Sequence, residues 1–128
     1  MQEKILILDF GSQYTQLIAR RVREQNVYCE IHPFHKIPPI DSSVKGIILS
    51  GSPFSVRDSD APQIDLSELK GMLPILGVCY GAQYLSYRFG GEVKPSASRE
   101  YGRAAMNVLD KDNQLLSGLS DKSQVWMS

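Results

Sequence analysis

The chain has 128 residues, of which 42% are hydrophobic, with 14 Lys plus Arg against 14 Asp plus Glu. This length predicts one compact domain that buries a core without a metal or disulfide staple. Balanced charge argues against a nucleic-acid binder, and the apolar stretches are far shorter than the roughly 20 residues of a membrane span. The N-terminus enters a strand almost at once and lacks the features of a signal peptide, which favours a cytoplasmic protein.

The first half of the chain alternates strand, helix and strand. Lys4–Asp9 is a continuous apolar run, typical of a strand covered on both faces. From Gln13, apolar residues recur at three- and four-residue steps and predict an amphipathic helix with one buried face: Tyr14, Leu17, Ile18 and Val22. Two more strands are predicted at Val27–Ile31 and Lys45–Ser50, with a proline-rich loop over 32–43 between them.

The second half begins with a predicted loop over 51–60 and a short helix over 66–70. A fourth strand is predicted at Leu73–Val78, followed by a helix at Gly81–Phe89 that buries Ala82, Leu85 and Phe89 and ends at Gly90-Gly91. Three extended pieces are predicted after it, at Glu92–Lys94, Ala104–Leu109 and Gln124–Met127.

This alternation predicts an α/β domain with three αβα layers around a mostly parallel sheet. Ligands of such sheets bind at the carboxyl ends of the strands. In this chain, those ends are the tripeptides 9–11, 50–52 and 78–80. One of the two cysteines, Cys79, therefore falls where chemistry is expected.

The segment from Gly77 to Gly81 has the form G-x-C-x-G between a predicted strand and a predicted helix. It is the cysteine version of the nucleophile elbow, a sharp turn that lifts its apical side chain into a cleft. Such a turn crowds the residues two before and two after the apex, and glycine relieves that crowding. The alternative is that Cys79 is a buried packing thiol, the commonest role of cysteine.

The elbow also places Cys79 at a helix N-terminus, where the dipole and the backbone N–H groups favour a thiolate and can hold an oxyanion. The Tyr80 N–H is one expected arm of that oxyanion hole. The second arm is expected from the neighbouring strand end at Gly51, Ser52 and Pro53.

Several motifs carry a family resemblance over essentially the whole chain. The segment GVCYGAQ, residues 77–83, resembles the nucleophile motif of class I (triad-type) glutamine amidotransferases, and IILSGSP, residues 47–53, resembles their oxyanion strand. Within that family, the block DFGSQYTQLIARRVRE, residues 9–24, resembles the N-terminal glutaminase domains of GMP synthases, and VYCEI, REYGRA and VWMS fit them too.

The resemblance implies a flavodoxin-like αβα domain in which Cys79 attacks the carboxamide of glutamine. It assigns the oxyanion hole to the backbone of Ser52, Tyr80 and Gly51. It also assigns glutamine binding to four positions: Gly51, Gln83, Met127 and Ser128. Ammonia would pass to an ATP-pyrophosphatase domain of the same enzyme, which is absent from these residues and would use ATP and Mg²⁺ to convert XMP into GMP. The whole enzyme would be a homo-oligomer, while this chain itself would hold no cofactor or metal.

Two features depart from the family pattern. Ser52 stands where the family usually has glycine, so a positive φ there would store strain. The family's catalytic histidine and glutamate form an H-x-E motif downstream of the VWMS segment, so residues 1–128 are expected to be a partial glutaminase domain without activity of its own. His32 and His35 are expected to be surface or packing residues, and Cys29 a packing residue.

Three alternatives remain open at the level of sequence. The chain could be the glutaminase of another class I amidotransferase, although the block over residues 9–24 argues against it. It could be an inert regulatory or binding module with the same fold. Cys79 could instead be a redox-sensing thiol.

Overall fold

A computed structural model describes residues 2–54, 72–94, 102–110 and 112–127, with only the backbone described at 126 and 127. The chain divides into two compact units, 1–93 and 94–128. The helix expected over 66–70 lies outside the described residues.

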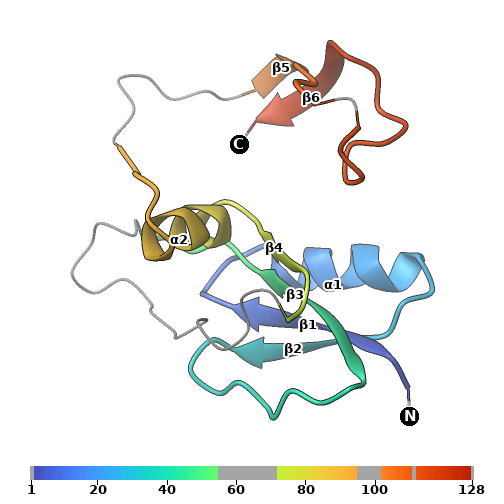
Figure 1. Ribbon diagram of the computed structural model, residues 1–128, viewed down its shortest axis with the longest axis vertical. Helices are drawn as coiled ribbons and strands as arrows, with labels where there is room; N and C mark the ends of the chain where they lie inside the picture. Colours follow the sequence, from blue (N-terminus) through green and yellow to red (C-terminus); the bar gives the residue numbers. More distant parts are fainter. Residues whose placement is uncertain (1, 55–71, 95–101, 111, 128) are drawn as a thin grey trace. The chain divides into compact units, whose positions relative to one another are not determined.

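The first unit is built on a parallel sheet of four strands in the order β2-β1-β3-β4 (Figure 1). The strands are β1 (Lys4–Asp9), β2 (Cys29–Pro33), β3 (Val44–Leu49) and β4 (Ile75–Gly77). The predicted parallel sheet is therefore confirmed. The boundaries differ: β2 starts two residues later than expected, β3 is shifted by one, and β4 is shorter at both ends.

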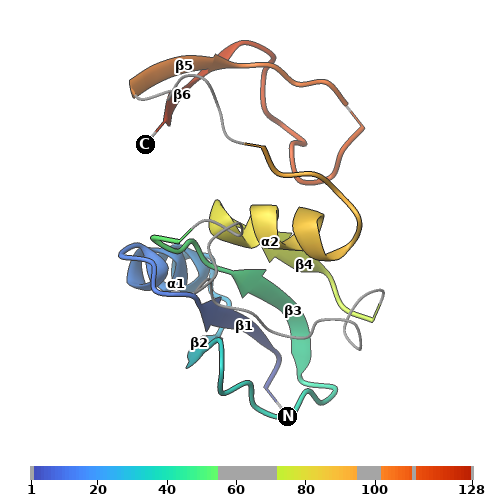
Figure 2. The same ribbon diagram turned by 90° about the vertical axis from the view of Figure 1, so that its left-hand side faces the viewer.

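The two helices of this unit, α1 (Thr15–Glu24) and α2 (Tyr80–Arg88), cover opposite faces of the sheet (Figure 2). Side chains alternate across a strand, so Leu6 and Leu8 of β1 face the core under α2, while Ile7 packs with Ala19 of α1 and Cys29. This is the three-layer arrangement expected. No helix in the described ranges is long and apolar enough to cross a bilayer.

The expected buried faces of both helices were partly wrong. In α1, Thr15 and Ala19 are buried, and Ile18 and Val22 pack against the buried cluster that contains Ala19, but Tyr14 and Leu17 are 50% and 44% exposed. Contacts with Ile7 of β1 and Cys29 of β2 therefore select Ala19 for the buried face.

In α2, the buried residues are Tyr80, Gly81 and Tyr84, whereas Ala82 is exposed and Phe89 is 37% exposed. The reason is an aromatic cluster that selects the tyrosine face. The ring of Phe10, just after β1, lies 5.6 Å from the Tyr80 ring and 6.0 Å from the Tyr84 ring. Offset and tilted aromatic pairs of this kind stabilise packing beyond the area they bury.

The second unit contains β5 (Gly102–Met106) and β6 (Ser123–Met127), which pair antiparallel. They correspond to the strands predicted at 104–109 and 124–127, but β5 starts and ends earlier and β6 starts one residue earlier. The extended piece expected at Glu92–Lys94 is not a strand.

The edge strand β2 carries a polar cluster centred on Glu30. Its Oε1 atom accepts a hydrogen bond from Lys4 Nζ at 3.2 Å and lies 3.1 Å from His32 Nε2, while its Oε2 accepts from the Tyr28 hydroxyl at 3.0 Å. The hydrogen bonds from His32, Tyr28 and Lys4 lower the pKa of Glu30 to about 2. The same contact with Glu30 raises the pKa of the Tyr28 hydroxyl.

The lowered pKa of Glu30 predicts acid-dependent stability. A carboxyl whose pKa falls on folding stabilises the protein above its unfolded pKa of 4.5 and loses that contribution as the pH falls toward 2. The stability difference between the wild type and Glu30→Gln, measured by urea unfolding, should therefore shrink between pH 5 and pH 2. Glu24→Gln, which removes an exposed pair with Arg21, is the control. Parallel pH profiles for wild type and Glu30→Gln would contradict this prediction.

Candidate active site

Cys79 lies at the junction of β4 and α2, as the nucleophile elbow requires. Its backbone has φ 52° and ψ −111°, a sparsely populated conformation for a residue with a side chain, and it directly precedes the first helical residue. Its thiol is exposed. The interpretation of Cys79 as a buried packing thiol is therefore wrong, and the left-handed turn is the strain that such elbows are known to store.

The two glycines of the motif fit where no side chain could. A Cβ on Gly77 would lie 2.6 Å from the backbone nitrogen of Ala82, and a Cβ on Gly81 would lie 2.5 Å from the carbonyl oxygen of Leu49. Both clashes are with backbone atoms, which cannot rotate away as the tip of a flexible side chain could. The crowding expected on both sides of the apex is confirmed.

Three strand ends meet around the thiol. A Cβ on Gly51, after β3, would lie 3.6 Å from Cys79 Cβ and 3.6 Å from the hydroxyl oxygen of Ser12, after β1. A Cβ on Gly11 would lie 3.5 Å from Cδ of Pro53. The carboxyl ends of β1, β3 and β4 thus enclose one small region, as expected for a parallel sheet.

The backbone amides of Gly51 and Ser52 follow β3 at the strand end beside this region. No residue that the structure describes accepts a hydrogen bond from the N–H of Gly51 or of Ser52. Ser52 is not among the residues with positive φ, so serine stands there without the strain considered for a glycine position. The strain is at Cys79 instead, and Tyr80, directly after it, places its own N–H at the start of α2.

Of the remaining expected site residues, Gln83 falls in the same unit as the thiol. It is exposed on α2, one turn after Cys79, and its N–H donates to the Cys79 carbonyl at 3.1 Å. Residues four apart share a helix face, so Gln83 can border what binds at the thiol. Met127 ends β6 in the second unit, and Ser128 lies outside the described residues. Their expected role in glutamine binding stays a prediction.

His32 lies too far from Cys79 to serve as its base. His32 pairs in register with Leu8, Leu8 with Leu49, and Leu49 with Gly77, so three strand spacings separate His32 from β4. At about 4.8 Å a spacing, this is about 14 Å, far beyond a proton transfer. His35 follows the same edge strand and contacts the Phe34 ring, with centroids 5.1 Å apart. The expectation that both are packing or surface residues is confirmed.

The second cysteine is structural. Cys29 on β2 is 1% exposed, and its Sγ lies 3.5 Å from the Ala19 carbonyl oxygen of α1. Its thiol is packed under α1, on the sheet face opposite α2. The two thiols therefore differ in exposure, which makes them separable by a water-soluble alkylating reagent.

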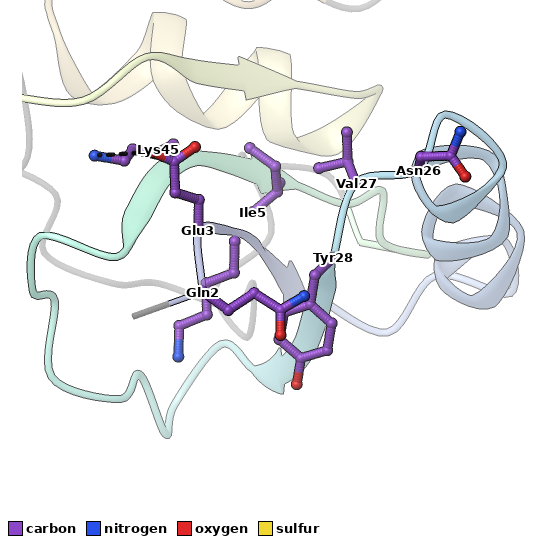
Figure 3. A pocket seen from close by; sticks show the side chains of 8 residues that line it. Gln2, Glu3, Ile5, Asn26, Val27, Tyr28 and Lys45 are labelled. Carbon is purple, nitrogen blue, oxygen red and sulfur yellow. Dashed lines mark ion pairs between the residues drawn. The ribbon is translucent and has the colours of Figure 1, made fainter.

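Two hollows lined by described residues of this unit lie away from the thiol. Figure 3 shows one at the amino ends of β1 and β3, bordered by Ile5, Tyr28 and an ion pair of Glu3 with Lys45 at 3.8 Å. A second hollow lies on the solvent face of α1, beside Arg20 and Arg23. Neither includes a strand end next to Cys79, so neither is a candidate for the site of chemistry.

Two serines that the sequence did not single out belong to this region. Ser12 lies beside Gly51, and its hydroxyl accepts the Tyr14 N–H at 2.9 Å in the turn that leads into α1. Ser50 is fully buried between the ends of β1 and β3. The signal in the sequence that could have identified them is a small polar residue close after a buried strand. Both lie at the edge of the sheet where ligands were already expected to bind.

The comparisons with known proteins agree with this geometry. The model of the family described as glutamine amidotransferase class-I matches residues 6–128. GMP synthases (glutamine-hydrolyzing) of Cytophaga hutchinsonii and Phocaeicola vulgatus are 64% and 62% identical over all 128 residues, which span 25% of each of those proteins. A crystal structure from Thermoplasma acidophilum, of a protein provisionally assigned as one subunit of a GMP synthase, is 30% identical, with a TM-score of 0.71 over 98% of this chain and 64% of that one.

The crowding at the elbow predicts that Gly81→Ala is strongly destabilising. The new methyl group would meet the Leu49 backbone at 2.5 Å, so the free energy of unfolding should fall by about 3 kcal/mol or more. Gly90→Ala is the matched control, because its Cβ would meet nothing within 4 Å and only the left-handed φ of +93° costs about 1 kcal/mol. Equal losses for the two variants in urea unfolding would show that the elbow is not crowded.

Proposed function

The chain belongs to the class I glutamine amidotransferase family, and from this we propose that it is the glutaminase region of a GMP synthase. The observation that carries the proposal is the exposed Cys79 held at φ 52° beside the open Gly51 and Ser52 amides. The identities of 64% and 62% to GMP synthases support this member of the family over other amidotransferases.

The proposed reaction is hydrolysis of the glutamine side chain in two steps. The Cys79 thiolate attacks the carboxamide carbon, and the resulting oxyanion accepts hydrogen bonds from the backbone of Ser52 and Tyr80. The C–N bond then breaks, ammonia leaves with a proton from a general acid, and a γ-glutamyl thioester remains on Cys79. Water attacks the thioester, releases glutamate and returns the thiol.

We propose that the general acid and base of this reaction lie outside the described residues. His32 is about 14 Å from the elbow and is engaged with Glu30 at 3.1 Å. The family resemblance assigns the role to an H-x-E motif. In this proposal, Cys79 is the nucleophile and the Ser52 and Tyr80 amides are the oxyanion donors, whereas proton transfer needs a further group.

The ammonia is proposed to be consumed by a synthetase region of the same enzyme. The relatives are about four times the length of this chain, and their name joins GMP synthesis to glutamine hydrolysis. That region would use ATP and Mg²⁺ to activate XMP for amination, and the whole enzyme would form a homo-oligomer. The glutaminase then serves only to deliver nitrogen.

The first test is Cys79→Ala in the full-length protein. Loss of the nucleophile should reduce glutamine-dependent GMP formation by at least about 10⁴-fold and spare formation from added ammonium. Cys29→Ala is the control, because that thiol is buried under α1 and should leave both activities. Equal loss of the two activities in Cys79→Ala would overturn the role proposed for Cys79.

The second test uses residues 1–128 on their own. We expect glutamine turnover at least about 10²-fold below that of the full-length enzyme, because residues 1–128 contain no H-x-E motif. Iodoacetamide should nevertheless label Cys79 and not Cys29, as read by peptide mass spectrometry. Turnover comparable to the full-length enzyme would show that these residues contain a base of their own.

A further inference from the structure

The hydroxyl of Ser50 makes two hydrogen bonds at the end of β3. It accepts the Phe10 N–H at 2.9 Å and donates to the carbonyl oxygen of Gly51 at 2.9 Å. Ser50 is 0% exposed, and its own N–H donates to the Leu8 carbonyl at 3.0 Å. The hydroxyl therefore acts inside the protein both as an acceptor and as a donor, and it donates to the backbone of the segment 47–53.

The carbonyl of Gly51 and the N–H of Ser52 belong to one peptide unit. The chain has no cis peptide bond among its described residues, so these two groups point in opposite directions. A carbonyl held toward the buried Ser50 hydroxyl therefore turns the Ser52 N–H away from it. That N–H has no acceptor in the described part of the chain.

The orientation of the Gly51–Ser52 peptide must be fixed by a further contact, because the glycine backbone does not fix it. A Cβ on Gly51 would make only ordinary van der Waals contacts, with Cys79 Cβ and the Ser12 hydroxyl oxygen at 3.6 Å, so no steric clash fixes the peptide that follows it. Glycine tolerates either orientation of a peptide about as readily. The reversed orientation would aim the Gly51 carbonyl oxygen at the region where negative charge develops, and would place the N–H against Ser50.

We propose that Ser50 is a positioning residue of the glutaminase, whose hydroxyl holds the 51–52 peptide with its N–H available to the oxyanion. This inference rests on the proposed function, because it assigns a task within that reaction. Through the Phe10 N–H, the same hydroxyl ties the oxyanion strand to the end of β1. An interaction that matters only once the oxyanion forms should affect kcat and leave KM nearly unchanged.

The test is Ser50→Ala in the full-length enzyme, with Ser50→Cys as a second variant that fills the site with a weak donor. Loss of one oxyanion donor costs about 10²–10³-fold in kcat. Because the unlocked peptide still samples the productive orientation, we expect a fall of about 10- to 100-fold for glutamine, with KM and ammonia-dependent activity within about twofold. If Ser50→Ala does not fold, Ser50→Cys carries the test.

Two further measurements separate positioning from simple structural support. Alkylation of Cys79 by iodoacetamide forms no oxyanion, so its rate should stay within about twofold in both variants while glutamine turnover falls. Ser43→Ala is the matched control: Ser43 is buried at the other end of β3, its hydroxyl bonds to Asp41, and its loss should leave kcat unchanged. A kcat for Ser50→Ala within about twofold of wild type, or equal losses in Ser50→Ala and Ser43→Ala, would overturn the proposal.

Cys79→Ala, assayed alongside, distinguishes this inference from the function on which it rests. If Cys79→Ala retains glutamine-dependent activity, the proposed glutaminase reaction fails, and the inference about Ser50 fails with it. If Cys79→Ala loses that activity and Ser50→Ala keeps it, only the role of Ser50 fails.

Discussion

The left-handed turn at Cys79 is the constraint on which the arrangement of the first unit depends. A residue with a side chain held at φ 52° and ψ −111° costs on the order of 1–3 kcal/mol, and the surrounding packing must outweigh that cost. The close fit of Gly77 and Gly81 against neighbouring backbone provides part of it, and the rings of Phe10, Tyr80 and Tyr84 provide more. The strain leaves the thiol exposed at the start of α2.

The reaction proposed for this chain requires more than the turn at Cys79. In that proposal the elbow presents the nucleophile, and the developing negative charge also needs hydrogen-bond donors. Because β3 pairs with both β1 and β4, its carboxyl end brings the Gly51 and Ser52 amides next to Cys79. The proposed reaction also needs a group for proton transfer, and His32, on β2 at the far side of the four strands, lies too far from Cys79 to supply it.

The sequence predicted the layers, the parallel sheet and the elbow because each depends on local pattern. The apolar run at 4–9 and the glycines around Cys79 are short-range signals that need no knowledge of partners. The buried faces of the helices were partly missed because tertiary packing decides them: Phe10 contacts Tyr80 and Tyr84 of α2, and Ala19 of α1 packs with Ile7 and Cys29. The role of Ser50 was missed because it depends on two hydrogen bonds that no sequence periodicity reveals. One joins its hydroxyl to Phe10, 40 residues earlier, and the other joins it to the carbonyl of the next residue, Gly51.

The most direct measurement is to identify the residue that carries the glutamyl group during turnover. The full-length enzyme, mixed with isotopically labelled glutamine and quenched in acid, should yield a γ-glutamyl thioester on the peptide that contains Cys79, as seen by mass spectrometry. A label on the Cys29 peptide, or steady glutamine hydrolysis with no label on Cys79, would contradict the account.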